Sequence, residues 1–451
     1  MSKDQGSESA VSRSQSIKED EMAEEKEASK RVSRRQFVKG AALGAGALAG
    51  AGALASCAPA ATPVPAQECP PCATPWLPES WDEEADVVVC GSGTVGAPAA
   101  IDAYDAGADV LIIEKMDWLG GMMRRCGGGI AGANTIVQKE LGVTDDADSY
   151  YEYLVACGEG LIDPEMHRVQ ADNSGANVDW IIEDLGGQPV SEWDFSTPED
   201  EGMTICVVPG LNISGTPVWF EKYGMEPVQR CHWFKPNPDD LDPEDERGYC
   251  RDEIVGFPER DKGRGGTGLW KPFEDAITAR NIRTMMETSL AGLVANPDGE
   301  VLGIKAVSAG KTLYIKARKG VVLATGSGEN NKAMAMSYNL AEPVAGPYGG
   351  AGISIPGEND GAGIAAALAV GADMSFIALG TQTLPSGGIK INTKAQVIDV
   401  YGEPIPRLYA GGTTAGGSQA RQYPNCGHAV SFSLCFGRVA GQNAAAETAW
   451  E

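Results

Sequence analysis

Residues 85–115 constrain the fold more than any other stretch, because they read as strand, glycine-rich turn, helix and strand in close succession. A run of valines predicts a buried first strand, and a Gly-x-Gly-x-x-Gly turn begins directly after it at Gly91. An alanine-rich helix follows, and a second apolar strand over 110–113 ends at Glu114. This order of elements is typical of a nucleotide-binding βαβ unit.

Each glycine of the turn answers a separate physical need. Gly91 allows a tight turn, Gly93 allows a pyrophosphate to approach the backbone, and Gly96 allows the helix to pack closely on the strand. Free N–H groups at the helix start hold the phosphates. Glu114 is placed to accept hydrogen bonds from the adenosine ribose and would repel a 2′-phosphate, so we expect FAD or NAD rather than NADP.

Composition excludes some partners. The chain has 451 residues, 43% of them hydrophobic, which is enough for one large α/β domain with a lobe. Its formal net charge is −26 at pH 7. Such an acidic protein is a poor partner for nucleic acid or for anionic membrane surfaces.

The first 56 residues read as an export signal. Residues 1–32 are polar without apolar periodicity, so we expect disorder; Ser-Arg-Arg-Gln-Phe-Val-Lys at 33–39 is a twin-arginine signature. The uncharged Ala/Gly/Leu stretch over 40–55 is too short and too weakly apolar for a membrane span. We therefore expect a cleaved signal and an extracytoplasmic protein that is exported after it has folded around its cofactor.

Residues 57–82 predict a Pro/Ala-rich linker with two open questions. Leu-Ala-Ser-Cys before it resembles a lipobox, in which Cys57 would carry lipid and anchor the protein to the membrane; plain cleavage is the alternative. Cys69 and Cys72 lack the histidine that a c-type haem needs, so a local disulfide or two idle thiols remain. The other cysteines are scattered without ligand spacing, so we expect most of them to be small core residues; an iron–sulfur cluster that uses some of them is the alternative.

Several later motifs resemble one superfamily. Gly-Gly at 120–121, Gly-Gly-Gly-Ile at 127–130, Val-Val-Leu-Ala-Thr-Gly at 321–326 and Ile-Pro-Arg-Leu-Tyr-Ala-Gly-Gly at 405–412 resemble the FAD-binding proteins that include fumarate reductases, flavocytochromes c, urocanate reductases and 3-ketosteroid dehydrogenases. The resemblance implies a Rossmann-like α/β domain of the glutathione-reductase type. Because residues 116–133 contain no histidine for a covalent link, it also implies non-covalent FAD.

The resemblance also implies where FAD is bound. The helix starting near residue 427 should direct its positive end at the flavin pyrimidine. Thr413 stands where relatives have glutamate, which leaves a contact there open. The implied cofactor contacts are Gly91, Ser92, Gly93, Thr94, Val95, Gly96, Glu114, Lys115, Gly120, Gly121, Gly128, Gly129, Ala324, Thr325, Gly326, Gly412, Thr413, His428, Ala429, Val430 and Ser431.

The FAD-binding domain is expected in two parts, 83–186 and 263–451. Helical periodicity over 144–185 resembles the paired helices of the superfamily, and the second part is expected to contain a helix over 269–281 and a hairpin with Asp-Gly at 298–299 in its turn. Between the two parts, residues 187–262 are rich in proline, acids and aromatic side chains. A long loop of this kind in a compact domain is usually functional, so we interpret it as an irregular insertion that closes over the site as a lid. A peripheral insertion or an oligomer contact is the alternative.

The expected reaction follows from what the chain lacks. Relatives carry a capping domain of well over a hundred residues, whereas this chain passes from Gln382 almost directly to Gly387, and Pro424 replaces the arginine that binds dicarboxylates. Fumarate is therefore an improbable substrate. Tyr-Pro-Asn-Cys-Gly at 423–427 instead resembles the Tyr-Pro-x-x-Gly of 3-ketosteroid dehydrogenases, which implies that the Tyr423 hydroxyl and the Gly427 N–H bind a ketone oxygen. A simple turn into the last helix is the alternative.

The catalytic candidates are Tyr423, Gly427, Arg421, His428, Arg260 and Tyr249. A proton donor is needed beside the ketone site, and Arg251 is a further possibility, whereas His167 and His232 read as structural or surface residues. We expect an exported FAD enzyme that reduces an activated C=C bond of an enone or enoate. No haem motif or second nucleotide site is visible, so electrons would come from a separate cytochrome- or quinol-linked donor. The alternatives are the reverse, ketosteroid-type dehydrogenation and a non-catalytic electron carrier.

Overall fold

The structure is a computed structural model that describes residues 77–189, 205–208, 211–213, 222–226, 228–235, 265–328, 330–331, 333–334, 357–375, 387–418, 424 and 427–451. The chain divides into the units Met1–Cys72 and Ala73–Glu451, and all described residues belong to the second unit. The predicted export signal, Cys57 and the Cys69–Cys72 pair lie outside the described residues. Among the helices that are described, none combines the length and the apolar character that a bilayer crossing requires.

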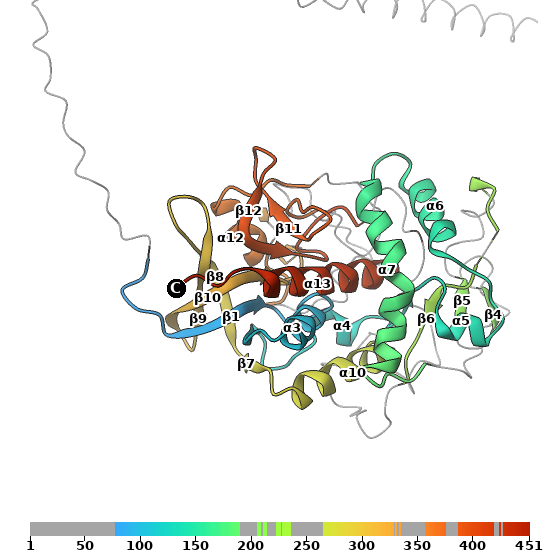
Figure 1. The fold of residues 1–451 in the computed structure, drawn as a ribbon, viewed down its shortest axis with the longest axis horizontal. Helices are drawn as coiled ribbons and strands as arrows, with labels where there is room; N and C mark the ends of the chain where they lie inside the picture. Colours follow the sequence, from blue (N-terminus) through green and yellow to red (C-terminus); the bar gives the residue numbers. More distant parts are fainter. Residues whose placement is uncertain are drawn as a thin grey trace, which may run out of the picture. The chain divides into compact units, whose positions relative to one another are not determined.

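The second unit is built on an eight-stranded mixed sheet (Figure 1). Its main strand order is β11-β12-β10-β1-β2-β7, and β8 and β9 extend from β10. The pairs of β1 with β2 and β10, of β10 with β12, and of β2 with β7 are parallel. The bounds are β1 Glu83–Cys90, β2 Val110–Ile113, β7 Arg283–Met285, β8 Thr288–Ala295, β9 Val301–Ser308, β10 Lys311–Leu323, β11 Gln396–Ile398 and β12 Pro404–Ala410.

The predicted βαβ unit is confirmed. Helix α3 (Gly96–Asp105) follows β1, and Glu114 comes directly after β2. The valines of β1 and the apolar residues of β2 are almost fully buried, as expected for central parallel strands. Helix α13 (His428–Ala446) packs beside α3 so closely that a Cβ at Gly441 would lie 2.2 Å from the Ala99 carbonyl oxygen.

The remaining helices follow the sequence pattern with shifted ends. Helices α6 (Ala147–Gly158) and α7 (Pro164–Glu183) form the predicted helical pair, and Asp146 and Asp163 cap them with their carboxylates. The predicted helix over 269–281 is α10 (Gly265–Ala279), which begins four residues earlier. The short helices are α4 (Gly121–Arg125), α5 (Ile136–Glu140) and α12 (Ala362–Ala369). The Asp298–Gly299 hairpin turn between β8 and β9 is confirmed.

A second sheet joins the predicted insertion to the FAD-binding domain. It contains four strands in the order β3-β6-β5-β4. Strand β3 (Ile130–Ala131) belongs to the glycine-rich loop after β2, whereas β4 (Ile205–Val208), β5 (Leu211–Ile213) and β6 (Cys231–His232) belong to residues 187–262. The insertion is thus partly regular where it is described, because its strands extend an edge that the glycine-rich loop supplies. Trp193, Trp219 and Phe257 lie outside the described residues.

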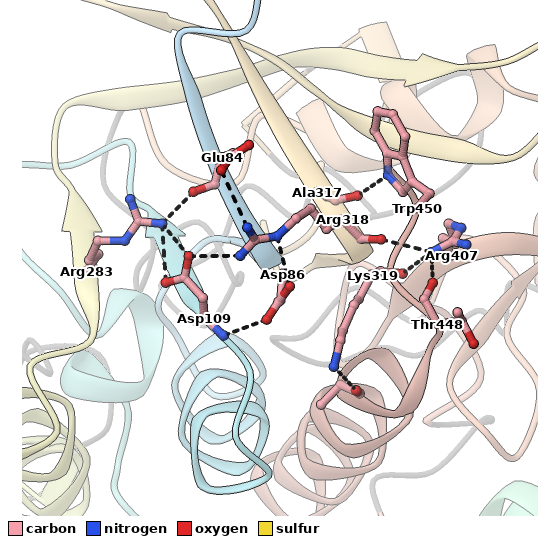
Figure 2. A network of polar contacts seen from close by, with 11 residues as sticks. Glu84, Asp86, Asp109, Arg283, Ala317, Arg318, Lys319, Arg407, Thr448 and Trp450 are labelled. Atoms are coloured by element: carbon pink, nitrogen blue, oxygen red, sulfur yellow. Dashed lines mark hydrogen bonds and ion pairs between the residues drawn. The ribbon is translucent and has the colours of Figure 1, made fainter.

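A charged network closes the end of the main sheet opposite the glycine-rich turn (Figure 2). The Arg318 guanidinium lies 2.9 Å from an Asp86 oxygen and 3.4 Å from an Asp109 oxygen, and Arg283 contacts the same Asp109 carboxylate at 3.1 Å. Trp450 donates its indole N–H to the Ala317 carbonyl at 2.7 Å. These contacts occupy the amino ends of β1 and β2, so the carboxyl ends are the place for a ligand, as in other open parallel sheets.

Candidate cofactor and substrate site

The three glycines of the turn after β1 are required for different reasons. Gly91 has a positive φ of 99°, and a Cβ there would lie 2.4 Å from the Ala324 carbonyl oxygen. A Cβ at Gly96 would lie 1.8 Å from the Gly91 carbonyl oxygen, so α3 can start only with a glycine at this position. A Cβ at Gly93 would meet no protein atom closer than the Gly120 carbonyl oxygen at 3.6 Å. The protein itself therefore leaves the space beside Gly93 open, which fits the expected pyrophosphate.

Ser92 and Glu114 lock the turn to the end of β2. One Glu114 oxygen accepts hydrogen bonds from the Ser92 N–H at 3.0 Å and from the Ser92 hydroxyl at 2.5 Å, and the other accepts from the Met116 N–H at 3.0 Å. The Ser92 hydroxyl in turn accepts from the Gly120 N–H at 2.9 Å. A carboxylate offers about four acceptor positions. One therefore remains for a ribose hydroxyl, as the predicted role of Glu114 requires.

The loop after β10 forms the second wall of the site. Ala324, Thr325 and Gly326 are partly accessible, and Gly326 has a positive φ of 74°. A Cβ at Gly326 would lie 2.1 Å from the Asn359 side-chain oxygen, which explains the glycine. The Thr325 hydroxyl accepts a hydrogen bond from the Gly363 N–H at 3.2 Å. The predicted strand-end motif thus faces the start of α12.

Residues 358–360 also belong to this wall, although no sequence motif predicted them there. Asp360 pairs with Lys115, which joins the segment to the end of β2. Glu358 forms an ion pair with Arg125 at 3.0 Å, and the two side chains are only 6% and 4% exposed. The run Gly-Glu-Asn-Asp-Gly at 357–361 was the available signal, since polar residues between glycines often mark a ligand loop.

The start of α13 forms the third wall. Gly427 caps the helix with a positive φ of 75°, and a Cβ there would lie 2.6 Å from the backbone of Ile130. Its carbonyl accepts from Ala131 at 3.2 Å and from Ser431 at 2.9 Å, while its N–H makes no hydrogen bond within the described residues. The Ser431 hydroxyl is buried and has no hydrogen-bond partner there either. Both groups are consistent with a ligand at the positive end of the helix.

His428 does not suit the acid role that was one of its two predicted roles. Its Nε2 lies 2.5 Å from the Ser418 carbonyl oxygen, which has no proton, so Nε2 carries the hydrogen. Its Nδ1 therefore accepts from the Gln170 amide at 3.2 Å. Burial and the His167 ring, which stacks at 5.9 Å, lower the pKa of His428 to about 3. The imidazole is fully buried and neutral, and each of its ring nitrogens makes a hydrogen bond. It therefore anchors the helix and cannot act as a general acid at neutral pH.

Of the other predicted cofactor residues, some are partly exposed near the glycine-rich turn and others are buried in the core. A Cβ at Gly412 would lie 2.7 Å from Val95, so Gly412 serves packing between β12 and α3. Gly128 and Gly129 are buried ahead of β3, and Gly121 begins α4. Thr413 and Val430 are partly exposed, whereas Ala429 is buried. Thr94 is partly exposed at the turn.

Most predicted catalytic side chains belong to segments outside the described part of the chain. Tyr423, Arg421, Arg260, Tyr249 and the further candidate Arg251 lie outside the described residues. His167 and His232 are buried, and their backbone and hydroxyl contacts are those of structural residues. The cysteines whose side chains the structure describes are Cys90, Cys126, Cys157, Cys231 and Cys435; all are free, and every one except Cys126 is buried. Within the described ranges, no cluster of His, Cys, Asp or Glu could hold a metal ion.

Comparison with known proteins agrees with this geometry. Digoxin reductase of Eggerthella lenta is 30% identical over 356 residues, which cover 76% of this chain and 55% of that protein. Urocanate reductase of the same organism is 26% identical over 270 residues, covering 59% of this chain and 36% of that protein. The chain thus spans about half or less of these curated relatives.

A solved structure shows the same fold. The 3-ketosteroid-Δ4-(5α)-dehydrogenase of Rhodococcus jostii RHA1, in complex with 4-androstene-3,17-dione, has a TM-score of 0.65 at 23% identity; the match covers 82% of this chain and 98% of that one. A family model described as FAD binding domain matches residues 86–386. The chain therefore belongs to the FAD-binding-domain family, and its cofactor is FAD.

Proposed function

We propose that the protein is an FAD-dependent oxidoreductase that reduces an activated C=C bond of an enone or enoate. The observation that carries this proposal is the start of α13, where Gly427, whose N–H makes no hydrogen bond to any described residue, packs against the glycine-rich loop of an FAD-binding domain. Similarity to digoxin, urocanate and acrylate reductases supports it. Fumarate is not the proposed substrate, because Pro424 stands where relatives carry the dicarboxylate-binding arginine.

The residues divide the work as follows. Bound FAD supplies hydride transfer. The Gly427 N–H and the Tyr423 hydroxyl bind the ketone oxygen and so make the β-carbon a better hydride acceptor. The positive end of α13 favours negative charge that develops near it. Since His428 is held neutral, the proton comes from Arg421, Tyr249, Arg251 or Arg260.

The setting is also part of the proposal. The twin-arginine signature supports export, and Cys57 is the proposed lipid attachment point. FAD is bound non-covalently, because the described glycine-rich loop offers no histidine. A separate cytochrome- or quinol-linked protein supplies the electrons.

A reduction screen tests this function. Purified enzyme is reduced with a limiting amount of reduced methyl viologen, and flavin reoxidation is followed with a panel of enones and enoates that includes 4-androstene-3,17-dione. At least one acceptor should reoxidise the flavin faster than buffer does, and Tyr423→Phe should slow that reaction about tenfold or more. Reoxidation by no acceptor, together with rapid electron exchange with a cytochrome, would instead identify an electron carrier.

The direction of the reaction needs its own measurement. 3-Oxosteroid 1-dehydrogenase of Mycolicibacterium smegmatis is 27% identical over 331 residues, so dehydrogenation of a saturated ketone is the second candidate. Rates with reduced viologen and an enone are compared with rates for the saturated ketone and an oxidised dye. A reductase gives the faster rate in the first assay.

A further inference from the structure

A buried ion pair joins two segments that follow different strands of the main sheet. Strand β1 lies between β2 and β10 and is parallel to both, so the segments after β2 and β10 leave one edge of the sheet on opposite sides of β1. Arg125 belongs to the first segment and Glu358 to the second. The Arg125 guanidinium lies 3.0 Å from a Glu358 carboxylate oxygen. The pair therefore links the two sides of the edge at which the Gly91 turn begins.

Arg125 belongs to the wall of the site that adjoins the glycine-rich turn. Helix α4 begins at Gly121, where a Cβ would lie 3.6 Å from the Gly93 Cα, so the helix borders the space expected to hold the pyrophosphate. Arg125 is the last residue of this helix, and its side chain is only 4% exposed. Its Nε is buried and makes no hydrogen bond, so Glu358 is the one acceptor described for this guanidinium. Loss of the Glu358 charge would leave a buried cation without its partner.

Glu358 belongs to a loop, residues 357–361, that is fastened to the opposite wall. The Gly361 N–H donates to the Ser327 carbonyl at 3.0 Å, and the Asn330 side-chain amide donates to the Glu358 carbonyl at 2.8 Å. Both bonds hold the 357–361 loop to the segment that follows β10. Contacts of another kind have to connect this loop with α4.

Three side-chain contacts make that connection within the described residues, and they differ in strength. The Lys115–Asp360 pair is exposed to water, with side chains 34% and 44% exposed, so its contribution is small. The Asn359 amide lies 2.7 Å from the Met122 sulfur, which is a weak acceptor. Only the Arg125–Glu358 pair is buried, with side chains 4% and 6% exposed.

A buried ion pair suits a connection that has to open. Closure removes both charges from water, and their mutual attraction offsets that cost, so the net gain from closure is small. Opening returns both charges to water, whereas the opening of an apolar contact would expose apolar surface. When one partner is removed, the other charge stays unpaired as long as the walls are closed. A single substitution should therefore favour the open arrangement.

We infer that the Arg125–Glu358 ion pair is a clasp that closes the FAD site and sets the rate of FAD release. The two side chains are positioning residues, because they hold two walls of the site together and take no part in hydride transfer. The inference concerns the cofactor alone, so it does not depend on which substrate is reduced.

The test measures FAD release from Glu358→Gln and Arg125→Met, with Arg280→Met as the matched control. Arg280 also forms an ion pair, with Asp105 at 2.7 Å, but its partner lies at the end of α3 and the side chains are 22% and 46% exposed. The FAD-loaded protein is diluted far below its dissociation constant, and the rise of flavin fluorescence gives the release rate. Release should be about tenfold faster or more in the two clasp variants and unchanged in the control. The association rate should change by less than about twofold.

A double variant and an exchange measurement separate a clasp from general damage. Methionine at both positions leaves no buried charge, so this variant should release FAD more slowly than Arg125→Met. In the FAD-loaded protein, amide exchange at Gly361 and Gly363, which bond to Ser327 and Thr325, should be about tenfold faster in Glu358→Gln than in the control.

Three results would overturn the inference. The first is release from both clasp variants at the rate of Arg280→Met. The second is a loss of affinity that comes entirely from slower association, because that would place the damage in the binding surface itself. The third is release from the double variant as fast as from Arg125→Met. If Arg125→Met does not fold, Glu358→Gln, which keeps the shape of the side chain, still decides.

Discussion

Gly93 and Gly96 belong to one motif, yet the structure predicts opposite consequences when each is replaced by alanine. A Cβ at Gly93 meets nothing closer than 3.6 Å, whereas one at Gly96 would lie 1.8 Å from a backbone oxygen. Gly93→Ala should leave the FAD-free protein as stable as wild type, or more stable by up to about 1 kcal/mol, because alanine restricts the unfolded chain. Gly96→Ala should cost about 3 kcal/mol or more, because α3 has to move away from the turn.

Gly93→Ala should weaken FAD binding even though it leaves the stability of the FAD-free protein unharmed. The added methyl group occupies the space that the pyrophosphate needs against the backbone, so we expect a loss of about tenfold to a hundredfold, or about 1.4–2.8 kcal/mol. The assays are thermal unfolding of the FAD-free protein and titration with FAD followed by flavin fluorescence. Gly292→Ala is the matched control, because a Cβ in that strand meets no atom within 4 Å.

Two results would refute this reasoning. Wild-type FAD affinity in Gly93→Ala would mean that the pyrophosphate does not lie beside that glycine. A Gly96→Ala protein with unchanged stability would mean that the contact between α3 and the Gly91 carbonyl is looser than the structure shows. If Gly292→Ala has the stability and FAD affinity of wild type, the effects at Gly93 and Gly96 are not a general consequence of replacing glycine by alanine.

Further predictions concern the polar contacts of the site. Ser92→Ala removes the hydroxyl bonded to Glu114 and should raise the FAD dissociation constant about tenfold, measured by the same titration with Ser80→Ala as control. Arg125→Met leaves the Glu358 carboxylate buried without its cation and should cost about 3–5 kcal/mol in urea unfolding, whereas the double change to methionine should cost clearly less; equal costs would contradict a buried ion pair. His428 is neutral when folded, with a pKa near 3, but the unfolded chain takes up a proton below about pH 6.5. The contribution of His428 to stability is therefore complete above that pH and falls by about 2 kcal/mol between pH 7 and 5. Because the pKa values of the buried His167 and His232 are also lowered, wild type should lose more than this in total, and the loss in His428→Gln should be about 2 kcal/mol smaller than in wild type.

The sequence was most informative where a residue's role depends on its immediate neighbours. The turn at Gly91, the acid at the end of β2 and the Asp298–Gly299 hairpin were all predictable, because backbone geometry alone demands those residue types. The start of α10 was less predictable. Three of its first four residues are glycines, which have poor helix propensity, and packing against α4 overrides that preference.

Contacts between segments that are far apart in the chain could not be predicted, because they produce no local pattern in the sequence. Asp360 reaches Lys115 across 245 positions, and Tyr153 reaches Pro424 across 271. Sequence periodicity placed Tyr153 on a helix but could not show what its hydroxyl contacts. The same limit applies to His428, for which the sequence left a cofactor contact and an acid role open, whereas burial and the neighbouring His167 ring keep the imidazole neutral.

This difference separates the two halves of the site. The proposed cofactor half is specified by backbone requirements within short stretches, so we expect a substitution there to change FAD binding directly. The proposed substrate half lies near the start of α13 and near Pro424, whose carbonyl accepts a hydrogen bond from the Tyr153 hydroxyl of α6. We therefore expect a substitution at Tyr153 to alter substrate turnover while leaving the Gly91 turn, and with it FAD affinity, unchanged. A Tyr153 variant that loses substrate turnover and FAD together would show that the two halves are not separable.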